Sequence, residues 1–366
     1  MTHTTFGFIG LGLIGGSIAK SIKRVFHTDA TIIAYDLNAT TLSTAREEGV
    51  IDVSCSSIDR TFSNCDFIFL CAPVHFNDEN LITLQPMLAD NCILTDVGSV
   101  KTDIHKHIKD LSLEHCFIGG HPMAGSEKTG YENSSDRLIE NAYYILTPTA
   151  QVPDACVKRY QALIEVLGAI PLILDYETHD YVTAAISHVP HIIAASLVNL
   201  VQISDNADGI MKMIAAGGFK DITRIASSSA AMWQQISLIN GTHIQKLLGD
   251  YISYLTHVQQ HIQAQDSSAL YELFDSARTY RDSFVEASPG PIKRIYSIYV
   301  DIPDETGGIA TIATILASHQ ISIRNIGIIH NRELESGALR IDFYEENDMQ
   351  QAIITLQKHN YKISQK

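Results

Sequence analysis

The sequence predicts three domains: an α/β domain on a parallel sheet over residues 1–173, an all-α domain over 174–288, and a small βαββαβ domain over 292–366. Three observations lead to this prediction. In the first half, short β-rich runs alternate with helix-like segments, which is typical of a parallel sheet with helices on both faces. Apolar residues at helical spacing dominate the middle of the chain. Strand and helix signals return together in the last part.

The first domain is expected to contain six strands, several of which are apolar throughout. Such runs are typical of a sheet whose two faces are both covered by helices. The predicted strands are Phe6–Ile9, Thr31–Tyr35, Phe67–Cys71, Cys92–Asp96, Cys116–Ile118 and Tyr143–Leu146. Helix-permissive segments, Ile14–Val25 and Ala39–Glu48 among them, lie between these strands.

The middle of the chain, from about Asp175 to Val285, is rich in Ala, Ile, Leu, Gln and Ser. Tyr181–Val201 and Ile244–Gln263 are predicted to form long, largely buried helices. Pro190 lies inside the first of them and is expected to kink it, because proline removes a backbone hydrogen bond. A helical domain with so much apolar surface often packs against a second copy, so a homodimer is one hypothesis. The interior of a single chain accommodates such helices equally well.

The tail begins after the clearest linker of the sequence, Ser288-Pro289-Gly290-Pro291, because Pro and Gly interrupt both helices and sheets. Beyond it we expect elements in the order βαββαβ, which is the ferredoxin-like arrangement. The predicted elements are the strand Ile295–Val300, the helix Gly308–Ser318, the hairpin strands Ser322–Ile329 and Ala338–Tyr344, the helix Asp348–Lys358 and the strand Tyr361–Ser364.

Composition narrows the possible classes of function. The chain has 366 residues, of which 45% are apolar, and carries 26 Lys and Arg against 41 Asp and Glu, a formal charge of -15. This balance argues against a general binder of nucleic acid or anionic membranes, and an anionic substrate would need local cations. The N-terminus lacks the pattern of a secretory signal, and no apolar run approaches the roughly 20 residues that span a bilayer. The six cysteines form no CxxC, so we expect reduced thiols and a cytoplasmic protein.

A glycine-rich loop follows the first predicted strand and opens the first helix. It reads Gly10-Leu11-Gly12-Leu13-Ile14-Gly15-Gly16-Ser17. Gly10 permits the tight turn, Gly12 lets the backbone approach a pyrophosphate, and Gly15 allows close helix–strand packing. The N-terminus of the helix adds free N–H groups and a partial positive charge. This context, strand then glycines then helix, predicts a Rossmann domain that binds a dinucleotide.

Asp36 ends the second predicted strand, about 20 residues after the last glycine of the loop. A carboxylate there accepts hydrogen bonds from an adenosine ribose and repels a 2′-phosphate. No Arg follows Asp36, so NAD is favoured over NADP. The predicted cofactor-binding residues are Gly10, Leu11, Gly12, Leu13, Ile14, Gly15 and Asp36. The alternative is a glycine-rich turn that binds another nucleotide or none.

Two further segments lie where the chain leaves predicted strands, Thr95–Lys101 and Gly119–Glu127. In open α/β sheets, ligands bind outside the carboxyl ends of the strands. His121 follows a Gly pair and precedes a Pro, and a neutral imidazole at this point can take a proton from a hydroxyl while hydride leaves the same carbon. Ser99 can share that hydrogen bond. The alternative is that His121 is only a polar residue of a turn.

The helical half carries two further clusters of candidate residues. His188 and His191 flank Pro190, which can aim them at a cleft, although satisfied core histidines beside a kink are nearly as plausible. Metal binding is less favoured, because no carboxylate or thiol lies nearby at ligand spacing. Arg224 can clamp a substrate carboxylate or pair with Asp221 within the chain. Trp233, the single tryptophan, is expected to wall the same site.

Five motifs together resemble the prephenate dehydrogenases of tyrosine biosynthesis. They are Gly10–Ser17, Thr95–Lys101, Gly120–Ser126, Ser187–His191 and Gly217–Arg224, and the likeness covers residues 6 to 285. The tail, with Asp301-Ile-Pro-Asp-Glu-Thr-Gly-Gly308 after its first strand, resembles an ACT domain, a small module that senses amino acids. Its loop departs from the usual Asp-x-Pro-Gly pattern by the insertion Asp304–Thr306.

The resemblance implies a role for each matching residue. His121 would deprotonate the ring hydroxyl, Ser99 would be its partner there, and Arg224 would bind a substrate carboxylate. The remaining implied substrate-site residues are His191, Trp233 and Gly217 in the pocket, with Glu127 and Asp221 as a charged pair at its mouth. The implied reaction is oxidative decarboxylation of prephenate by NAD to 4-hydroxyphenylpyruvate, with tyrosine as a possible effector. No metal is implied.

Three alternatives stay open at the level of sequence. A 3-hydroxyacid dehydrogenase would carry a Lys a few residues before an Asn in its long helix, whereas this chain has Ala194-Ala195-Ser196-Leu197-Val198-Asn199. An arogenate dehydrogenase would share the whole mechanism. The third alternative is a non-catalytic regulator that senses NAD or an amino acid, and the presence of His121, Ser99 and Arg224 together speaks against it.

Overall fold

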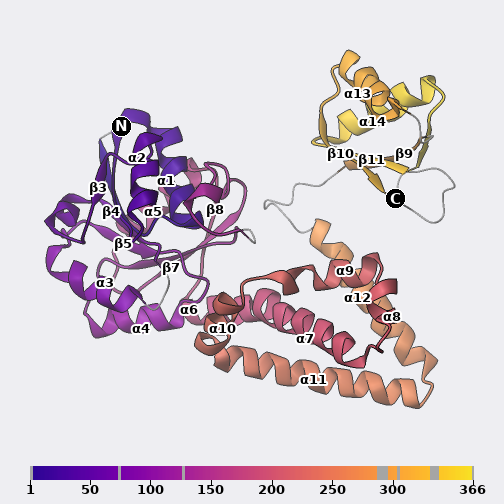
Figure 1. Cartoon of the computed structure of the whole chain (residues 1–366), viewed down its shortest axis with the longest axis horizontal. Helices are drawn as coiled ribbons and strands as arrows, with labels where there is room; N and C mark the ends of the chain where they lie inside the picture. Colours follow the sequence, from indigo (N-terminus) through magenta and orange to yellow (C-terminus); the bar gives the residue numbers. More distant parts are fainter. Residues whose placement is uncertain are drawn as a thin grey trace. The chain divides into compact units, whose positions relative to one another are not determined.

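The computed structural model describes residues 3–72, 76–125, 128–286, 296–302, 306–329 and 338–364. The chain divides into two compact units, Met1–Leu270 and Tyr271–Lys366 (Figure 1). Each unit is described by itself. The first unit contains the predicted α/β domain and the predicted helical domain as far as Leu270. The second unit contains the end of the predicted helical domain and the predicted βαββαβ tail.

A parallel five-stranded sheet forms the centre of the first unit, in the order β3-β2-β1-β4-β5. Its strands are β1 (Thr4–Ile9), β2 (Ala30–Tyr35), β3 (Val53–Cys55), β4 (Phe67–Leu70) and β5 (Ile93–Asp96), and the associated helices are α1 (Leu13–Phe26), α2 (Ala39–Glu47), α3 (Asn77–Leu84) and α4 (Thr102–Asp110). The four predicted strands of this sheet are confirmed to within two residues at either end. β3 was not predicted, because three residues are too few to show a periodicity.

Alternate residues of each strand enter two separate cores, which explains the apolar runs. Phe67 and Phe69 of β4 pack among α1, α2 and α5 (Asp154–Val166). Ile68 and Leu70 of the same strand pack among α3 and α4. Because successive side chains of a strand point to opposite faces, a strand covered on both sides must be apolar at every position. The prediction of helices on both faces of the sheet is confirmed.

A second, three-stranded sheet follows, in the order β6-β7-β8. Its strands are β6 (Ile118–Pro122), β7 (Tyr143–Pro148) and β8 (Ile170–Ile173). β6 and β7 are antiparallel, whereas β7 and β8 are parallel. The prediction of one parallel sheet is therefore wrong beyond β5, because the apolar pattern of a strand does not encode its direction. An isolated parallel bridge between Leu94 and Phe117 connects the two sheets.

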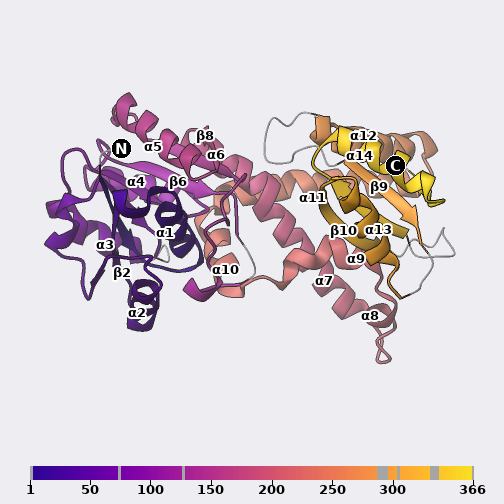
Figure 2. The ribbon, with the colours of Figure 1, turned by 90° about the horizontal axis from the view of Figure 1, so that it is seen from above.

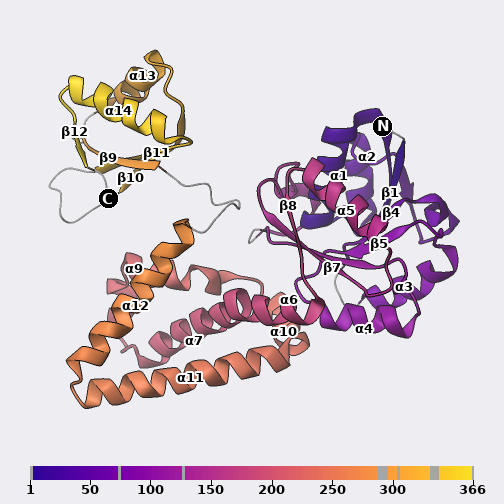
Figure 3. The ribbon, with the colours of Figure 1, turned by 180° about the vertical axis from the view of Figure 1, so that it is seen from behind.

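The rest of the first unit is helical. Its helices are α6 (Tyr176–Thr183), a π-helical turn (Ala184–His188), α7 (Val189–Ser204), α8 (Ile210–Ile214), α9 (Gly217–Thr223), a short 3-10 turn η7 (Arg224–Ser227), α10 (Ala230–Ile239) and α11 (Gly241–Gln263). Figure 2 shows α6 running on into α7 as one long rod, and α7 and α11 lie side by side in Figures 1 and 3. Pro190 lies at the second position of α7, directly after the π-helical turn.

The expectation that both long helices are largely buried is wrong within the chain. Leu200 and Ile203 of α7 are 55% and 79% exposed, and Ile252 and Ile262 of α11 are 56% and 60% exposed. Apolar residues surround these helices on several sides, and the neighbouring helices cover only some of them. The sequence pattern indicates that these apolar side chains favour burial, but it does not show which surface covers them.

The expectation about membrane-spanning runs also needs correction. Among the described residues, the helical run Tyr176–Ser204 has 29 residues and is apolar enough to cross a membrane by length and composition. Polar residues interrupt it too often for a continuous apolar stretch, but few of them are charged, so the mean hydropathy of a window is high. The core helix of a soluble protein passes the same test.

The six cysteines carry free thiols. Cys55, Cys65, Cys92 and Cys116 are buried. Burial raises the pKa of Cys65 to about 12 and that of Cys116 to about 11. A thiol in such surroundings is a packing group and not a nucleophile.

The second unit contains a four-stranded sheet in the order β10-β11-β9-β12. Its elements are β9 (Tyr296–Asp301), α13 (Gly308–Ser318), β10 (Ile323–Ile329), β11 (Ala338–Phe343), α14 (Glu346–Lys358) and β12 (Lys362–Ser364), and the unit also includes most of α12 (Ser267–Glu286). Every strand pair is antiparallel, and α13 and α14 lie on the same face of the sheet in Figures 1 and 3. The predicted order βαββαβ is confirmed. The linker Ser288–Pro291 and most of the insertion Asp304–Thr306 lie outside the described residues.

Candidate active site

The glycine loop turns from β1 into α1 where the sequence predicts. Gly10 has φ +98°, and a Cβ atom there would lie 2.7 Å from the backbone nitrogen of Ala72. A Cβ at Gly15 would lie 2.6 Å from the carbonyl oxygen of Gly10. Both positions therefore require glycine, one for the turn and the other for the close approach of α1 to the loop.

The same loop leaves space and donors for a diphosphate. No described atom lies within 4 Å of an ideal Cβ at Gly12, so the backbone there faces open space. No side chain caps the N-terminus of α1, and no acidic residue lies in its first turn. The uncapped N–H groups and the helix dipole suit an anion at this point. The residues present fit a dinucleotide.

Asp36 lies directly after β2, beside the glycine loop. Its carboxylate accepts hydrogen bonds from the backbone N–H of Leu11 at 2.7 Å and of Asn38 at 2.8 Å. The carboxylate is half-buried, so part of it stays accessible to a ligand. The position next to the loop is the one at which an acidic residue meets an adenosine ribose.

His121 is the fourth residue of β6, and a buried ion pair fixes the residue before it. Lys101 and Asp96 are both almost fully buried and form an ion pair. The Lys101 ammonium donates to the carbonyl oxygen of Gly120 at 2.8 Å, and the Gly120 N–H donates to Asp96 at 3.1 Å. Burial lowers the pKa of Lys101, against the opposing effect of Asp96. The pair ties the end of β5 to the backbone that carries His121.

The side chain of His121 contacts a second histidine that the sequence analysis did not single out. His121 Nδ1 lies 2.8 Å from His179 Nε2, and His179 Nδ1 lies 2.8 Å from the carboxylate of Asp180. Burial lowers the pKa of His121 well below its usual value, and the charge of the nearby Lys101 acts in the same direction. His121 is therefore neutral near pH 7 and able to accept a proton.

Asp180 is fully buried on α6 and reaches back to the start of α4. Its carboxylate accepts hydrogen bonds from the backbone N–H groups of Lys101 and Thr102, each at 2.8 Å, and from the Thr102 hydroxyl at 2.5 Å. Burial raises the pKa of Asp180, but the hydrogen bonds from His179 and Thr102 outweigh it and the net pKa is lowered. The carboxylate is thus ionised and joins α6 to the start of α4.

Ser99 is half-buried in the loop between β5 and α4. This loop begins at Asp96 and ends at Lys101, the two residues that hold the backbone beside His121. Ser99 and His121 are thus carried by backbone segments that the same buried ion pair connects.

A second group of aromatic side chains continues from this centre into the helical segment. His188 shares a hydrogen bond of 3.1 Å with Asn240, which also donates to the carbonyl oxygen of Asp180 at 2.8 Å. The Trp233 ring lies edge-on to His188 and is stacked on His191, with ring centroids 3.6 Å apart. Burial lowers the pKa of His188 to about 4. Both histidines are therefore neutral members of an aromatic wall.

Arg224 begins the turn η7 and is exposed. Its positive charge acts on His191, whose pKa is lowered first by burial, against the effect of the hydrogen bond to Ser187. Trp233 Nε1 is buried and has no hydrogen-bond acceptor among the described residues. An aromatic wall, an unsatisfied N–H and a guanidinium thus occur together, which suits an aromatic or ring-shaped anion.

The comparisons with known proteins agree with this geometry. The family model described as "Prephenate dehydrogenase, nucleotide-binding domain" matches residues 18–171, and the model "Prephenate dehydrogenase, dimerization domain" matches residues 175–276. The prephenate dehydrogenase of Bacillus subtilis is 38% identical over 94% of this chain and 93% of its own length. That of Lactococcus lactis is 34% identical over 96% of each chain.

The chain belongs to the prephenate dehydrogenase family. As a member of this family it is an NAD-dependent oxidoreductase. Among solved structures, the prephenate dehydrogenase of A. aeolicus in complex with hydroxyphenyl propionate and NAD+ is 33% identical, with a TM-score of 0.73, and covers 78% of this chain and 99% of its own. The arogenate dehydrogenase of Synechocystis is 29% identical, with a TM-score of 0.70, and covers 77% and 100% respectively.

Within this family member the predicted site residues differ in how they are placed. His121, His191 and Trp233 belong to one continuous set of contacts through His179, Asp180, Asn240 and His188. The charge of Arg224 acts on His191 at the end of this set. Gly217 and Asp221 lie on the exposed helix α9, which leads into η7. Glu127 lies outside the described residues.

Four residues of the dehydrogenase site were missed by the sequence analysis: Asp96, Lys101, His179 and Asp180. Asp96 and Lys101 lie in a quoted motif, and a charged pair flanking an otherwise uncharged Val-Gly-Ser-Val stretch is a signal that was present. His179-Asp180 offered no such signal, because the chain has 16 histidines and nothing in their spacing distinguishes His179.

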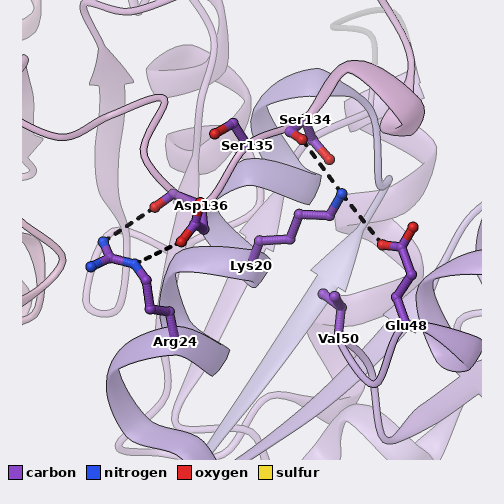
Figure 4. Close-up of a pocket in the computed structure, with 7 residues that line it drawn as sticks. All are labelled: Lys20, Arg24, Glu48, Val50, Ser134, Ser135 and Asp136. Carbon is purple, nitrogen blue, oxygen red and sulfur yellow. Dashed lines mark hydrogen bonds and ion pairs between the residues drawn. The ribbon is translucent and has the colours of Figure 1, made fainter.

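A surface pocket of the first domain lies apart from these residues (Figure 4). It is lined by Lys20, Arg24, Glu48, Val50, Ser134, Ser135 and Asp136. Lys20 pairs with Glu48 at 3.4 Å and Arg24 pairs with Asp136 at 3.0 Å. Both cations are thus paired within the chain: Lys20 connects α1 to the end of α2, and Arg24 connects α1 to the segment after Tyr131.

Proposed function

We propose that the protein oxidatively decarboxylates prephenate with NAD and that His121 accepts the proton of the ring hydroxyl. The arrangement of His121 carries this proposal. Its imidazole is neutral and is hydrogen-bonded through His179 to Asp180. Its backbone is bonded to the edge of the sheet where β5 ends and where the glycine loop leaves β1. A base at that edge lies where ligands bind in open α/β sheets.

The bond changes balance without any further reactant. The glycine loop and Asp36 would hold NAD, which would supply the acceptor for the hydride of the ring carbon that bears the hydroxyl. His121 receives the hydroxyl proton and can return it to the phenolate product. The bond between the ring and its carboxylate breaks, carbon dioxide leaves, and the bonding pair completes the aromatic ring. Aromatisation drives the reaction, so the protein mainly has to position its reactants and handle one proton.

Arg224 is proposed to bind a carboxylate of the substrate, with Trp233 and His191 against the ring. A chain with a formal charge of -15 repels a dianion, so a local guanidinium is needed, and its planar fork matches a carboxylate. The unsatisfied N–H of Trp233 supplies a further donor. Ser99 is proposed to share the hydroxyl hydrogen bond with His121. Gly217, and Glu127 with Asp221 at the mouth of the site, stay predictions.

We propose that the working form is a cytoplasmic homodimer built on the helical segment. The family model that matches residues 175–276 is described as a dimerization domain. The most exposed apolar side chains of this region include Ile203 at 79% and Leu238 at 75%, and a second copy would remove such side chains from water. Leu238→Glu should therefore produce monomers in light scattering, and Ile82→Glu, at an exposed site on α3, should leave dimers. Dimers of the Leu238 variant would contradict this interface.

The second unit is proposed to be an ACT-like regulatory domain that responds to tyrosine. The order βαββαβ and the antiparallel sheet support this proposal. All the proposed catalytic and substrate residues lie before residue 234, so the tail is not needed for the chemistry. Removing residues 292–366 should keep turnover and abolish inhibition by tyrosine. Inhibition that survives the truncation would place the effect of tyrosine at the active site.

Steady-state formation of NADH tests the proposed reaction directly. Prephenate and arogenate are each supplied with NAD or NADP. We expect turnover with prephenate and NAD, and poor use of NADP because Asp36 repels a 2′-phosphate. A preference for arogenate would keep the mechanism and change the substrate. No turnover with either would overturn the proposal.

A further inference from the structure

Asp180, His179 and His121 form a chain of hydrogen bonds. This chain determines which ring nitrogen of each histidine carries a proton. The Asp180 carboxylate is an acceptor only, since it is ionised and already accepts from Lys101 and Thr102. His179 Nδ1 must therefore carry the proton that points to Asp180. A neutral His179 then has a lone pair on Nε2, and this atom faces His121 Nδ1 at 2.8 Å.

The same reasoning extends to His121. Because His179 Nε2 is an acceptor, His121 Nδ1 must be the donor of the bond between them. A neutral His121 has one ring proton, so its Nε2 is left with a free lone pair. The tautomer that this chain of hydrogen bonds selects is thus the one in which the outer nitrogen of His121 is a base.

We propose that His179 and Asp180 are positioning residues that hold His121 in the tautomer with an unprotonated Nε2 and support the positive charge that it gains during the reaction. This inference rests on the proposed role of His121 as the base. After proton transfer, His121 still donates from Nδ1 to His179, and the buried Asp180 carboxylate lies one imidazole further on. A second ring between acid and base distinguishes this arrangement from a direct Asp–His pair.

Because the residues of this hydrogen-bond chain are buried, water cannot compensate for a proton on the wrong ring nitrogen. His179 and Asp180 have no solvent-exposed surface, so a mismatched proton would leave an unsatisfied buried group. Such a mismatch would disfavour the tautomer that carries it. No water can replace either partner without a rearrangement of α6 against α4. Hydrogen bonds from the Thr183 hydroxyl to the carbonyl oxygen of His179 and from the Asn240 amide to that of Asp180 keep the backbone in place.

Substitutions of His179 separate positioning from mere packing. His179→Leu removes the acceptor for His121 Nδ1, and we expect kcat to fall about 100-fold or more while KM for prephenate changes less than about threefold. In His179→Gln the amide oxygen can take the place of Nε2, so at least about tenfold of the loss should be recovered. Equal losses in the two variants would overturn the proposal.

Asp180→Asn tests the proton positions themselves. An amide that donates to His179 Nδ1 would invert both tautomers and leave a proton on His121 Nε2. Nitrogen NMR of the histidine side chains should show His121 protonated at Nδ1 in the unsubstituted enzyme and at Nε2 in the variant. His121 protonated at Nε2 in the unsubstituted enzyme would refute the proposal without any activity measurement, even if Asp180→Asn does not fold.

His105→Gln is the matched control. His105 is also buried beside α6, but its Nε2 bonds to the Thr147 hydroxyl at 2.8 Å, outside the chain from Asp180 to His121. This variant should lose stability and keep kcat within about threefold. A loss of kcat as large as that of His179→Leu would show that damage to packing explains both. Failure of the unsubstituted enzyme to use prephenate would count against the proposed function, whereas the NMR result would still decide the tautomers.

Discussion

At the scale of single residues, the chemistry of His121 comes from its neighbours. Lys101 and Asp96 fix the backbone at Gly120, and His179 holds the imidazole ring. Burial keeps the imidazole neutral. A histidine in an open turn would have none of these constraints, so the same residue type would be a less directed base with a larger protonated fraction near pH 7.

His121→Asn should therefore lose most of kcat and keep its substrate affinity. General acid–base catalysis contributes about 10²- to 10⁴-fold, and we expect a loss within that range, with KM for prephenate nearly unchanged. His115→Asn, at an exposed position, is the control and should behave as the unsubstituted enzyme. A large rise in KM with an unchanged kcat would contradict the role as a base.

Arg224→Gln should weaken the binding of substrate more than that of NAD. Loss of a charge-assisted hydrogen bond costs about 1.5–3 kcal/mol, so KM for prephenate should rise about 10- to 100-fold. Lys220→Gln removes the same charge one turn earlier on the exposed helix α9 and should have little effect. Equal losses for prephenate and NAD would argue against a carboxylate clamp.

At the scale of elements, the unit from β1 to α1 assigns different tasks to two glycines. Gly12 faces open space, whereas Gly15 is packed against the carbonyl oxygen of Gly10 and the side chain of Cys71. Gly12 leaves space for the ligand, whereas Gly15 allows the close packing of α1. Both belong to one motif, and the motif alone does not separate their roles.

Alanine substitutions at the two glycines should separate these roles. Gly12→Ala adds a methyl group to the space for the diphosphate, so KM for NAD should rise about tenfold or more with the thermal midpoint unchanged. Gly15→Ala forces a shift of α1 and should cost about 1–3 kcal/mol of stability. Kinetic titration with NAD and thermal unfolding check the pair. A destabilised Gly12 variant with normal affinity for NAD would contradict this division.

At the scale of the whole molecule, buried histidines make the stability of the fold depend on pH. Burial lowers the pKa of both His105 and His188 to about 4, well below the ordinary value of about 6.5. In the unfolded chain these side chains take up protons near their ordinary pKa. The unfolded state therefore binds more protons than the native state between these two values, and stability falls as the pH falls through this window.

Acid should therefore destabilise the protein before its carboxylates titrate. Each of the two histidines contributes on the order of 3 kcal/mol of lost stability by about pH 4. Urea unfolding at about pH 7 and about pH 5, at fixed protein concentration, should give a lower midpoint at the acid value. His105→Gln should show a lower midpoint at neutral pH and a weaker dependence on pH. An unchanged pH dependence in that variant would contradict the role of His105.

The sequence by itself determined most of the elements, the glycine loop, the tail topology and a set of candidate site residues, because periodicity, turn residues and short motifs are local properties. It placed His121, Arg224, His191 and Trp233 among the candidates. Only the tertiary structure decided the direction of β6, the exposure of α7 and α11, and the partners of His121. His179 and Asp180 lie 58 and more residues away along the chain, and no local pattern reports which distant side chain will meet a base. Contacts of that kind depend on how α6 packs against α4 and β6.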